Sequence, residues 1–174
     1  MARIPDFDLS QASAELTEEL AKRPAPLLNY YRMLAHGGSV AVGFLQLGGA
    51  ILHRSEIDPR LRELVILRTG AHCRSEYEIC QHKRIASSVG VPDAKIAAAV
   101  DLDLPLQPGA LDATEVLLLR FTDELVRDVK ASQGTFSRMC DAFPYKQVLE
   151  VVLTTGFYMA VSRFLETFEV DIED

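Results

Sequence analysis

Five polar side chains between positions 63 and 82 have the types and spacing of an acid/base site. The stretch ELVILRTGAHCRSEYEICQH contains Glu63, Ser75, Tyr77, Glu78 and His82. Ser75, Glu78 and His82 fall on one stripe of a helix, since successive helical residues are separated by about 100°. A carboxylate and an imidazole one turn apart can share a proton, and Glu63, from the preceding segment, would fix the tautomer of the histidine. The pattern predicts that Glu63 and His82 form a general acid/base pair.

The same residues also have purely structural interpretations. Ser75 followed by Glu78 is an S-x-x-E capping box, in which both side chains bind free N–H groups at a helix start. His82 would then be a hydrogen-bonded helix histidine, and Glu63 a solvated residue in the first turn of a helix opened by an Asp-Pro pair. At the level of sequence both interpretations stay open.

These residues must be positioned by helices, because apolar residues recur with helical spacing and no convincing alternating strand is present. The expected helices cover residues 10–22, 26–36, 38–53, 59–72, 75–89, 93–100, 112–130, 135–142 and 144–168. Asp112 with Glu115 forms a second capping box, and Gly90 with Pro92 ends a helix. The irregular stretch 102–111 either flanks the site or only connects two helix groups. The last helix is apolar on nearly every face, which predicts burial against several neighbours or a partner subunit.

Length and composition predict one cytoplasmic domain over residues 1–174. The chain is 48% hydrophobic, enough for a proper core, and its 174 residues fit a single domain. No apolar run approaches the ~18 residues that cross a membrane, and the N-terminus lacks a basic region followed by an apolar one. The net charge of -7 argues against nucleic acid as a partner.

The segment around the candidate site is basic although the whole chain is acidic. Between positions 60 and 84, six Lys or Arg residues stand against three Glu residues. This local excess favours a small anionic substrate such as a carboxylate, whereas on outer helix faces the same residues would simply be solvated.

The three cysteines, Cys73, Cys80 and Cys140, predict neither a disulfide framework nor a metal site. Their number is odd, and their spacing matches neither C-x-x-C nor a zinc-ligand pattern. Cys73, near a helix N-terminus, is the cysteine expected to have some thiolate character. We expect no metal and no cofactor.

The run RELVILRTGAHCRSEYEICQHKRIASSVGVPDAKIAA resembles the carboxymuconolactone decarboxylase family, which shares the all-α fold of the AhpD-like alkylhydroperoxidases. The family pattern is a glutamate in an R-x-E-L-x-I-L helix, then Y-E-x-x-x-H on the next helix, then a glycine. Glu63, Tyr77, Glu78, His82 and Gly90 stand at these positions, and the resemblance continues through GFYMAVSRFLETFEVDIE. It implies an all-α, AhpD-like helical bundle that forms a homotrimer or homohexamer.

The chain departs from the peroxidase branch of this resemblance. Members of that branch carry Cys-x-x-Cys, with the second cysteine four residues before the histidine. Ser75 and Glu78 occupy the two positions here, so both sulfurs of the redox relay are missing and peroxide chemistry by that relay is not expected. Cys73 and Cys80 each lie two residues away, on other faces of a helix.

The resemblance implies a cofactor-free carboxy-lyase that acts on a small carboxylated lactone or a related carbon acid. His82 would deliver or remove the proton, Glu63 would orient the imidazole, and Tyr77 or Glu78 would position the substrate. Arg68 or Arg74 would hold an anionic group of the substrate by paired hydrogen bonds, with Ser75 as a further substrate contact. Two alternatives stay open. One is an AhpD-like alkylhydroperoxidase of the peroxiredoxin type, which needs a working thiol, and the other is a non-catalytic oligomeric binding module.

Overall fold

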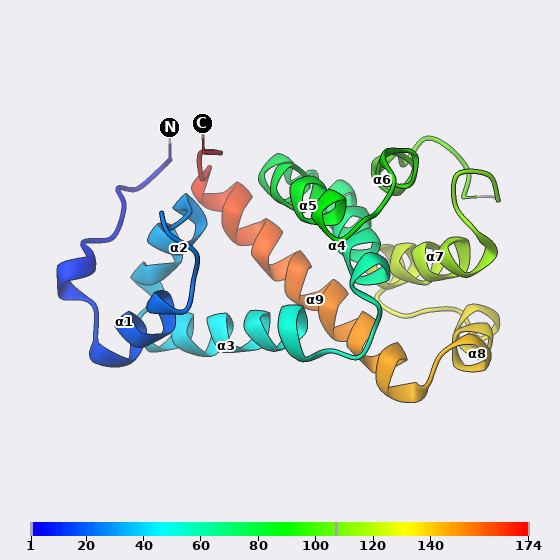
Figure 1. Cartoon of the computed structure of the whole chain (residues 1–174), viewed down its shortest axis with the longest axis horizontal. Coiled ribbons are helices and arrows are strands. Elements are labelled where there is room, and N and C mark those ends of the chain that lie inside the picture. Colours follow the sequence, from blue (N-terminus) through cyan, green and yellow to red (C-terminus); the bar gives the residue numbers. More distant parts are fainter. Residues whose placement is uncertain (1, 107, 174) are drawn as a thin grey trace. The chain divides into compact units, whose positions relative to one another are not determined.

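The computed structural model describes residues 2–106 and 108–173, and its regular structure is almost entirely helical (Figure 1). In these residues the β structure is limited to an isolated bridge between Pro108 and Leu111. The predicted all-α class is confirmed. The helices are α1 (Ala14–Ala21), α2 (Asn29–Leu34), α3 (Ser39–Arg54), α4 (Pro59–Cys73), α5 (Glu76–Ser88), α6 (Asp93–Val100), α7 (Ala113–Asp128), α8 (Gln133–Ala142) and α9 (Tyr145–Phe168), with 3-10 turns at Leu9–Gln11 and Ala35–Gly37.

The largest differences from the expected boundaries lie near the N-terminus. The helix expected over 10–22 starts later, because Ser13 is its N-cap and accepts a hydrogen bond from the N–H of Leu16. The helix expected over 26–36 divides into α2 and a 3-10 turn. From α3 onwards the observed boundaries stay within a few residues of those expected.

The chain divides into two compact units. The smaller unit contains the residues up to Arg54 and those from Phe164 onwards. Its core is formed mainly by α1 and α3, through side chains such as Leu16 and Leu45. The larger unit, Ser55–Arg163, contains every predicted site residue. That the two units act as one domain over 1–174 stays a prediction, and positions 1 and 174 lie outside the described residues.

Helix α4 is enclosed in the larger unit. It contacts α5, α6 and α7 and lies between α5 and α7 (Figure 1). Two hydrophobic clusters meet on it, one through Val65 and the other through Leu64 and Leu67. All residues from 62 to 71 are buried. The polar side chains of α4 therefore lie away from water, and each needs a partner within the protein.

The apolar helix α9 is the longest in the chain. By length and composition it is apolar enough to cross a membrane. An 18-residue stretch of α9 has a mean hydropathy of 1.4, and half of that stretch is buried. The expectation from the sequence that no apolar run has the length to cross a membrane is therefore wrong. A helix in a protein core can have the same length and composition, and Val151, Tyr158 and Val161 of α9 are indeed buried. On the opposite side Tyr145 and Leu149 are 79% and 57% exposed.

The irregular stretch 102–111 contains no helix, as expected, although Gln107 lies outside the described residues. The stretch lines a cavity of about 200 Å³ together with Ala98. None of the predicted site residues lines this cavity. The connector interpretation therefore accounts for the stretch without a role in the candidate site.

Candidate functional site

The turn between α4 and α5 determines where the predicted site residues point. Arg74 has a left-handed backbone, with φ 56° and ψ 35°. Its N–H donates to the carbonyl oxygen of Ala71, and the N–H of Ser75 donates to that of Gly70, both at 3.0 Å. These two bonds form a Schellman motif, which satisfies the last carbonyl groups of α4. The N–H of Ser75 is therefore not available to a side chain of α5.

The capping box predicted for Ser75 and Glu78 is wrong for this reason. Ser75 is the N-cap of α5, but its side chain makes no capping hydrogen bond. Its Oγ is buried, and among residues 2–106 and 108–173 it has no hydrogen-bond partner. The second capping box is present: the N–H of Glu115 donates to the Asp112 carboxylate, and the N–H of Asp112 donates to that of Glu115.

Glu63 and His82 meet inside the larger unit, as their spacing predicts. The distance from Oε2 of Glu63 to Nδ1 of His82 is 2.6 Å. The other oxygen of Glu63 accepts hydrogen bonds of 3.3 Å from Nε and Nη2 of Arg62. Glu63 is 0% exposed, so the interpretation of Glu63 as a solvated residue is wrong. Two charged partners hold the carboxylate and so orient the imidazole.

The other side of the His82 ring faces Glu78 and Tyr158. Nε2 of His82 lies 3.5 Å from Oε2 of Glu78, and the Tyr158 ring packs edge-to-face with its centroid 4.9 Å from that of His82. Helices α4 and α5 pack closely here, since a Cβ at Gly70 would lie in van der Waals contact, 3.4 Å from the Cβ of Glu78. The structure thus adds Tyr158 to the site, a residue on α9 that no motif in the sequence indicates.

The burial of this cluster brings its protonation into the neutral range. Burial raises the pKa of Glu78 to about 7, opposed by the charge of His82 and assisted by that of Glu63. Burial on its own would lower the pKa of His82, but the hydrogen bond to Glu63 and the charges of both glutamates outweigh it and raise the pKa. His82 therefore favours the imidazolium form, and its titration is coupled to that of Glu78.

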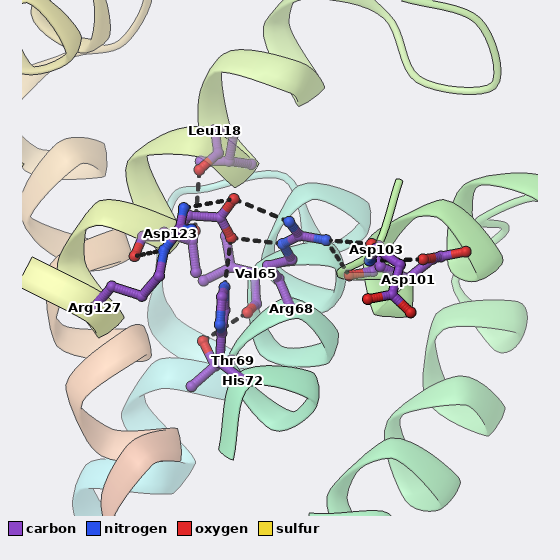
Figure 2. A network of polar contacts seen from close by, with 11 residues as sticks. Val65, Arg68, Thr69, His72, Asp101, Asp103, Leu118, Asp123 and Arg127 are labelled. Carbon is purple, nitrogen blue, oxygen red and sulfur yellow. Dashed lines mark hydrogen bonds and ion pairs between the residues drawn. The ribbon is translucent and has the colours of Figure 1, made fainter. Parts of the chain in front are cut away.

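Arg68 belongs to a separate buried network. Figure 2 shows its guanidinium facing the carboxylate of Asp123 on α7. Nε and Nη2 of Arg68 lie 2.6 and 2.9 Å from the two carboxylate oxygens, and Nη1 donates to the carbonyl oxygen of Asp101 at 2.7 Å. His72 Nε2 lies 2.7 Å from the same Asp123. Burial would raise the pKa of Asp123, but its contacts with His72 and Arg68 lower it.

This network explains Arg68 without a ligand. The residue is 3% exposed, and its donors join α4 to α7 and to the residue after α6. The other basic residues near the site are also partly engaged, because Arg60 pairs with Asp58 and Arg62 with Glu63. Three of the six basic residues of this segment, Arg60, Arg62 and Arg68, are thus engaged in ion pairs with carboxylates of the protein.

Two further predicted residues differ in exposure. Tyr77 is buried, at 4% exposed, on the first turn of α5. Arg74 is exposed where α4 ends. Of the residues singled out in the sequence, the structure brings Glu63, Glu78 and His82 together, leaves Ser75 at the start of the same helix, and separates Arg68 into its own network.

The chain has similarities to known proteins. Residues 40–118 match the carboxymuconolactone decarboxylase family. No curated protein matches the chain in sequence. The AhpD core of an uncharacterized peroxidase-related protein from Ralstonia eutropha JMP134 has a TM-score of 0.82 and 16% identity, over 99% of this chain and 93% of that chain.

Two other solved structures have the same fold. The debrominase Bmp8, in complex with 2,3,4-tribromopyrrole, has a TM-score of 0.75 and 15% identity, over 99% of this chain and 94% of that chain. An uncharacterized peroxidase-related protein from Silicibacter sp. TM1040 has a TM-score of 0.76 and 13% identity, over 97% of this chain and 91% of that chain. At these identities the similarity concerns the fold.

The matched region 40–118 includes α4, α5 and all the predicted site residues. The fold similarity extends over nearly the whole chain. The match to the carboxymuconolactone decarboxylase family over residues 40–118 supports membership of that family, and the described residues have the AhpD-like helical fold.

Proposed function

We propose that the protein is a cofactor-free enzyme that performs acid/base chemistry, by decarboxylation or proton transfer, on a small carboxylated lactone or a related carbon acid. The observation that supports this most directly is the buried hydrogen bond of 2.6 Å between Glu63 and His82. A buried carboxylate–imidazole pair next to a carboxyl group with a pKa of about 7 exchanges protons at neutral pH.

Loss of CO₂ leaves an electron pair on carbon, which must then receive a proton. The cluster of Glu63, Glu78 and His82 stores such a proton in the protein interior. Arg62 lies 3.3 Å from the Glu63 carboxylate, and the hydrogen bond between Glu63 and His82 raises the pKa of the imidazole. Tyr77 lies on the first turn of α5 and would help to position the substrate. Arg74, exposed beside Ser75, is the basic side chain we propose for the anionic group of the substrate.

A thiol-dependent activity is the second candidate, because similar structures include peroxidase-related proteins and a debrominase. At the positions of the redox pair, however, this chain has Ser75 and Glu78, which cannot cycle through sulfenate and disulfide. This candidate would have to use Cys73 or Cys80, both partly buried and neither in a disulfide. The acid/base proposal uses the residues that are present at the site.

We also propose that the protein forms a homo-oligomer, a trimer or hexamer. The motivation is the outer side of α9, where Tyr145, Leu149 and Leu153 are 79%, 57% and 48% exposed. Apolar side chains in such a row are more often covered than solvated. A non-catalytic oligomeric binding module would share this feature but would show no turnover.

The test is turnover of 4-carboxymuconolactone, measured as release of CO₂ by the wild type and by His82→Gln and Glu63→Gln. We expect each variant to lose about 100-fold or more in kcat, as is typical when a general acid or base is removed. His53→Gln, an exposed histidine in the smaller unit, is the matched control. Absence of turnover by the wild type, or wild-type turnover by His82→Gln, would contradict the proposal.

The thiol candidate is tested in the same preparations with cumene hydroperoxide and dithiothreitol. We expect the rate to be that of the reaction without protein. A protein-dependent rate that disappears in Cys73→Ser or Cys80→Ser, with CO₂ release absent, would rank the thiol activity first. Absence of both activities in the wild type would favour the binding module.

A further inference from the structure

We infer that Glu78 is the residue that exchanges the proton with the substrate, and that the Ser75 hydroxyl beside it binds a substrate oxygen. This inference rests on the proposed acid/base function and deepens it, because it assigns the residues in contact with the substrate. His82, to which the sequence pattern gives the proton transfer, becomes a positioning residue.

The surroundings of His82 exclude it as the base. Its Nδ1 lies 2.6 Å from Glu63, and its Nε2 lies 3.5 Å from Glu78. With a carboxyl group next to each nitrogen, the hydrogen bond to Glu63 and the charges of both glutamates raise the pKa of His82 and favour the protonated ring. An imidazolium has no lone pair with which to take a proton from carbon. The carboxylate of Glu78 does have one, and Glu63 already uses its oxygens on Arg62 and His82.

Two polar atoms at the start of α5 lack a hydrogen bond. In the part of the chain that the structure describes, neither Ser75 Oγ nor Glu78 Oε2 has a hydrogen-bond partner, although both are buried. Ser75 is 0% and Glu78 5% exposed. A buried polar group without a partner costs about 1–3 kcal/mol, so both atoms favour a bound group that can donate and accept. The ion pair with His82 at 3.5 Å is too long to satisfy Glu78 fully.

The position of Ser75 selects the kind of atom that binds there. Ser75 precedes the first turn of α5, a helix of 13 residues, and its side chain caps none of the N–H groups of that turn. A helix start carries a partial positive charge and favours an oxygen on which negative charge develops. An enolate or a carboxylate oxygen of the substrate fits this description. Ser75 and the start of α5 would then stabilise the intermediate formed after proton removal or loss of CO₂.

The charged groups around Glu78 adjust its proton affinity. Glu63 and Arg62 face the cluster from α4, His82 lies one turn further along α5, and Tyr158 packs on His82 from α9. Burial raises the pKa of Glu78 to about 7, whereas the charge of His82 opposes this shift. Near neutral pH, Glu78 is therefore present both as an acid and as a base, as general acid/base catalysis requires.

The chemical step balances without another reactant. In decarboxylation the bond from carbon to the carboxylate breaks, CO₂ leaves, and the electron pair that stays on carbon takes the proton of the Glu78 carboxyl group. Glu78 recovers a proton from solvent through His82, so each CO₂ released consumes one proton. In a proton transfer, the Glu78 carboxylate removes a proton from one carbon and returns it to another.

The experiment compares Glu78→Gln, Glu78→Asp and Ser75→Ala in the CO₂ assay with 4-carboxymuconolactone. We expect Glu78→Gln to lose at least about 100-fold in kcat, and Glu78→Asp to retain part of it with a shifted pH profile. For Ser75→Ala we expect a loss of about 10-fold or more in kcat. Glu76→Gln and Ser87→Ala, which change the same residue types at exposed positions of α5, should behave as the wild type.

A second readout does not depend on activity. Infrared difference spectra of ¹³C-glutamate-labelled protein should show a carboxyl group that loses its proton near pH 7. We expect this signal in the wild type and in Glu76→Gln, and its absence in Glu78→Gln.

The possible outcomes separate this inference from the proposed function. If Glu78→Gln keeps near-wild-type turnover while His82→Gln is inactive, the inference is wrong and the proposed function stands. Absence of the infrared signal in the wild type would also overturn the inference. If the wild type releases no CO₂, the proposed function fails, and the inference fails with it.

Discussion

Oε2 of Glu78 lies 3.5 Å from Nε2 of His82, on a ring whose other nitrogen is held by Glu63 at 2.6 Å. The imidazole thus lies between two glutamates from consecutive helices, and both glutamates are buried. Glu78 and His82 at this separation cannot titrate independently. The pH dependence of stability and the effects of substitutions should therefore test this coupling without a substrate.

The stability of the protein should fall as the pH rises from about 4.5 through about 7. The folded-state pKa of Glu78, about 7, lies above its ordinary value of 4.5, and that of His82 is also raised. The folded protein then binds more protons than the unfolded chain in this window, so the free energy of unfolding decreases with pH. In Glu78→Gln the decrease should be smaller by a quantity on the order of 3 kcal/mol.

Urea unfolding at a series of pH values measures this effect. Glu76→Gln, at an exposed position on the same turn of α5, is the control and should follow the wild-type curve. Identical curves for Glu78→Gln and the wild type would mean that Glu78 is not proton-linked to folding.

Tyr158→Leu should destabilise the protein more than Tyr158→Phe. The edge-to-face contact, at 4.9 Å between ring centroids and 88° between planes, needs an aromatic ring on α9. Such a contact contributes about 0.5–1.5 kcal/mol beyond apolar burial, and phenylalanine preserves it. Chemical denaturation of the two variants gives the difference. Equal stability of the two would indicate that the ring contact contributes nothing.

Asp123→Ala should cost about 3–5 kcal/mol, because it leaves the buried Arg68 without its carboxylate partner. Asp128→Ala, at an exposed position on the same helix, should change stability by less than about 0.5 kcal/mol. The contribution of Asp123 should also disappear in acid. Its pKa is lowered below 3.8, so its stabilisation is present above that pH and is lost as the pH falls through the folded-state pKa. A loss for Asp123→Ala no larger than for the control would show that the network does not stabilise the fold.

Light scattering at micromolar concentration should give a mass that is three or six times the chain mass of 19.3 kDa. Placing charge on the exposed side of α9, with Leu149→Glu and Leu153→Glu together, should lower that mass, because an apolar interface does not accommodate buried carboxylates. Lys130→Glu, an exposed position outside α9, should leave the mass unchanged. A wild-type mass of 19.3 kDa would contradict the proposed assembly.

The sequence alone determined most of the helices and the contact between Glu63 and His82. Periodicity and punctuation located α3 to α9, since helical burial leaves a regular apolar pattern and Asp58 and Pro59 have the residue types of a helix start. The spacing of the polar residues, together with a resemblance to a family, also identified Glu63 and His82 before their hydrogen bond was seen.

The tertiary structure decided the roles of the other polar residues, because each role depends on a partner distant in the sequence. Arg68 carries the same charge as Arg74, yet only Arg68 meets Asp123, which a different helix supplies. Ser75 and Glu78 fit a capping box, but the Schellman bonds of α4 take the N–H that the box needs. Local patterns predict which residues lie on a helix, whereas long-range packing determines which polar groups are left without a partner.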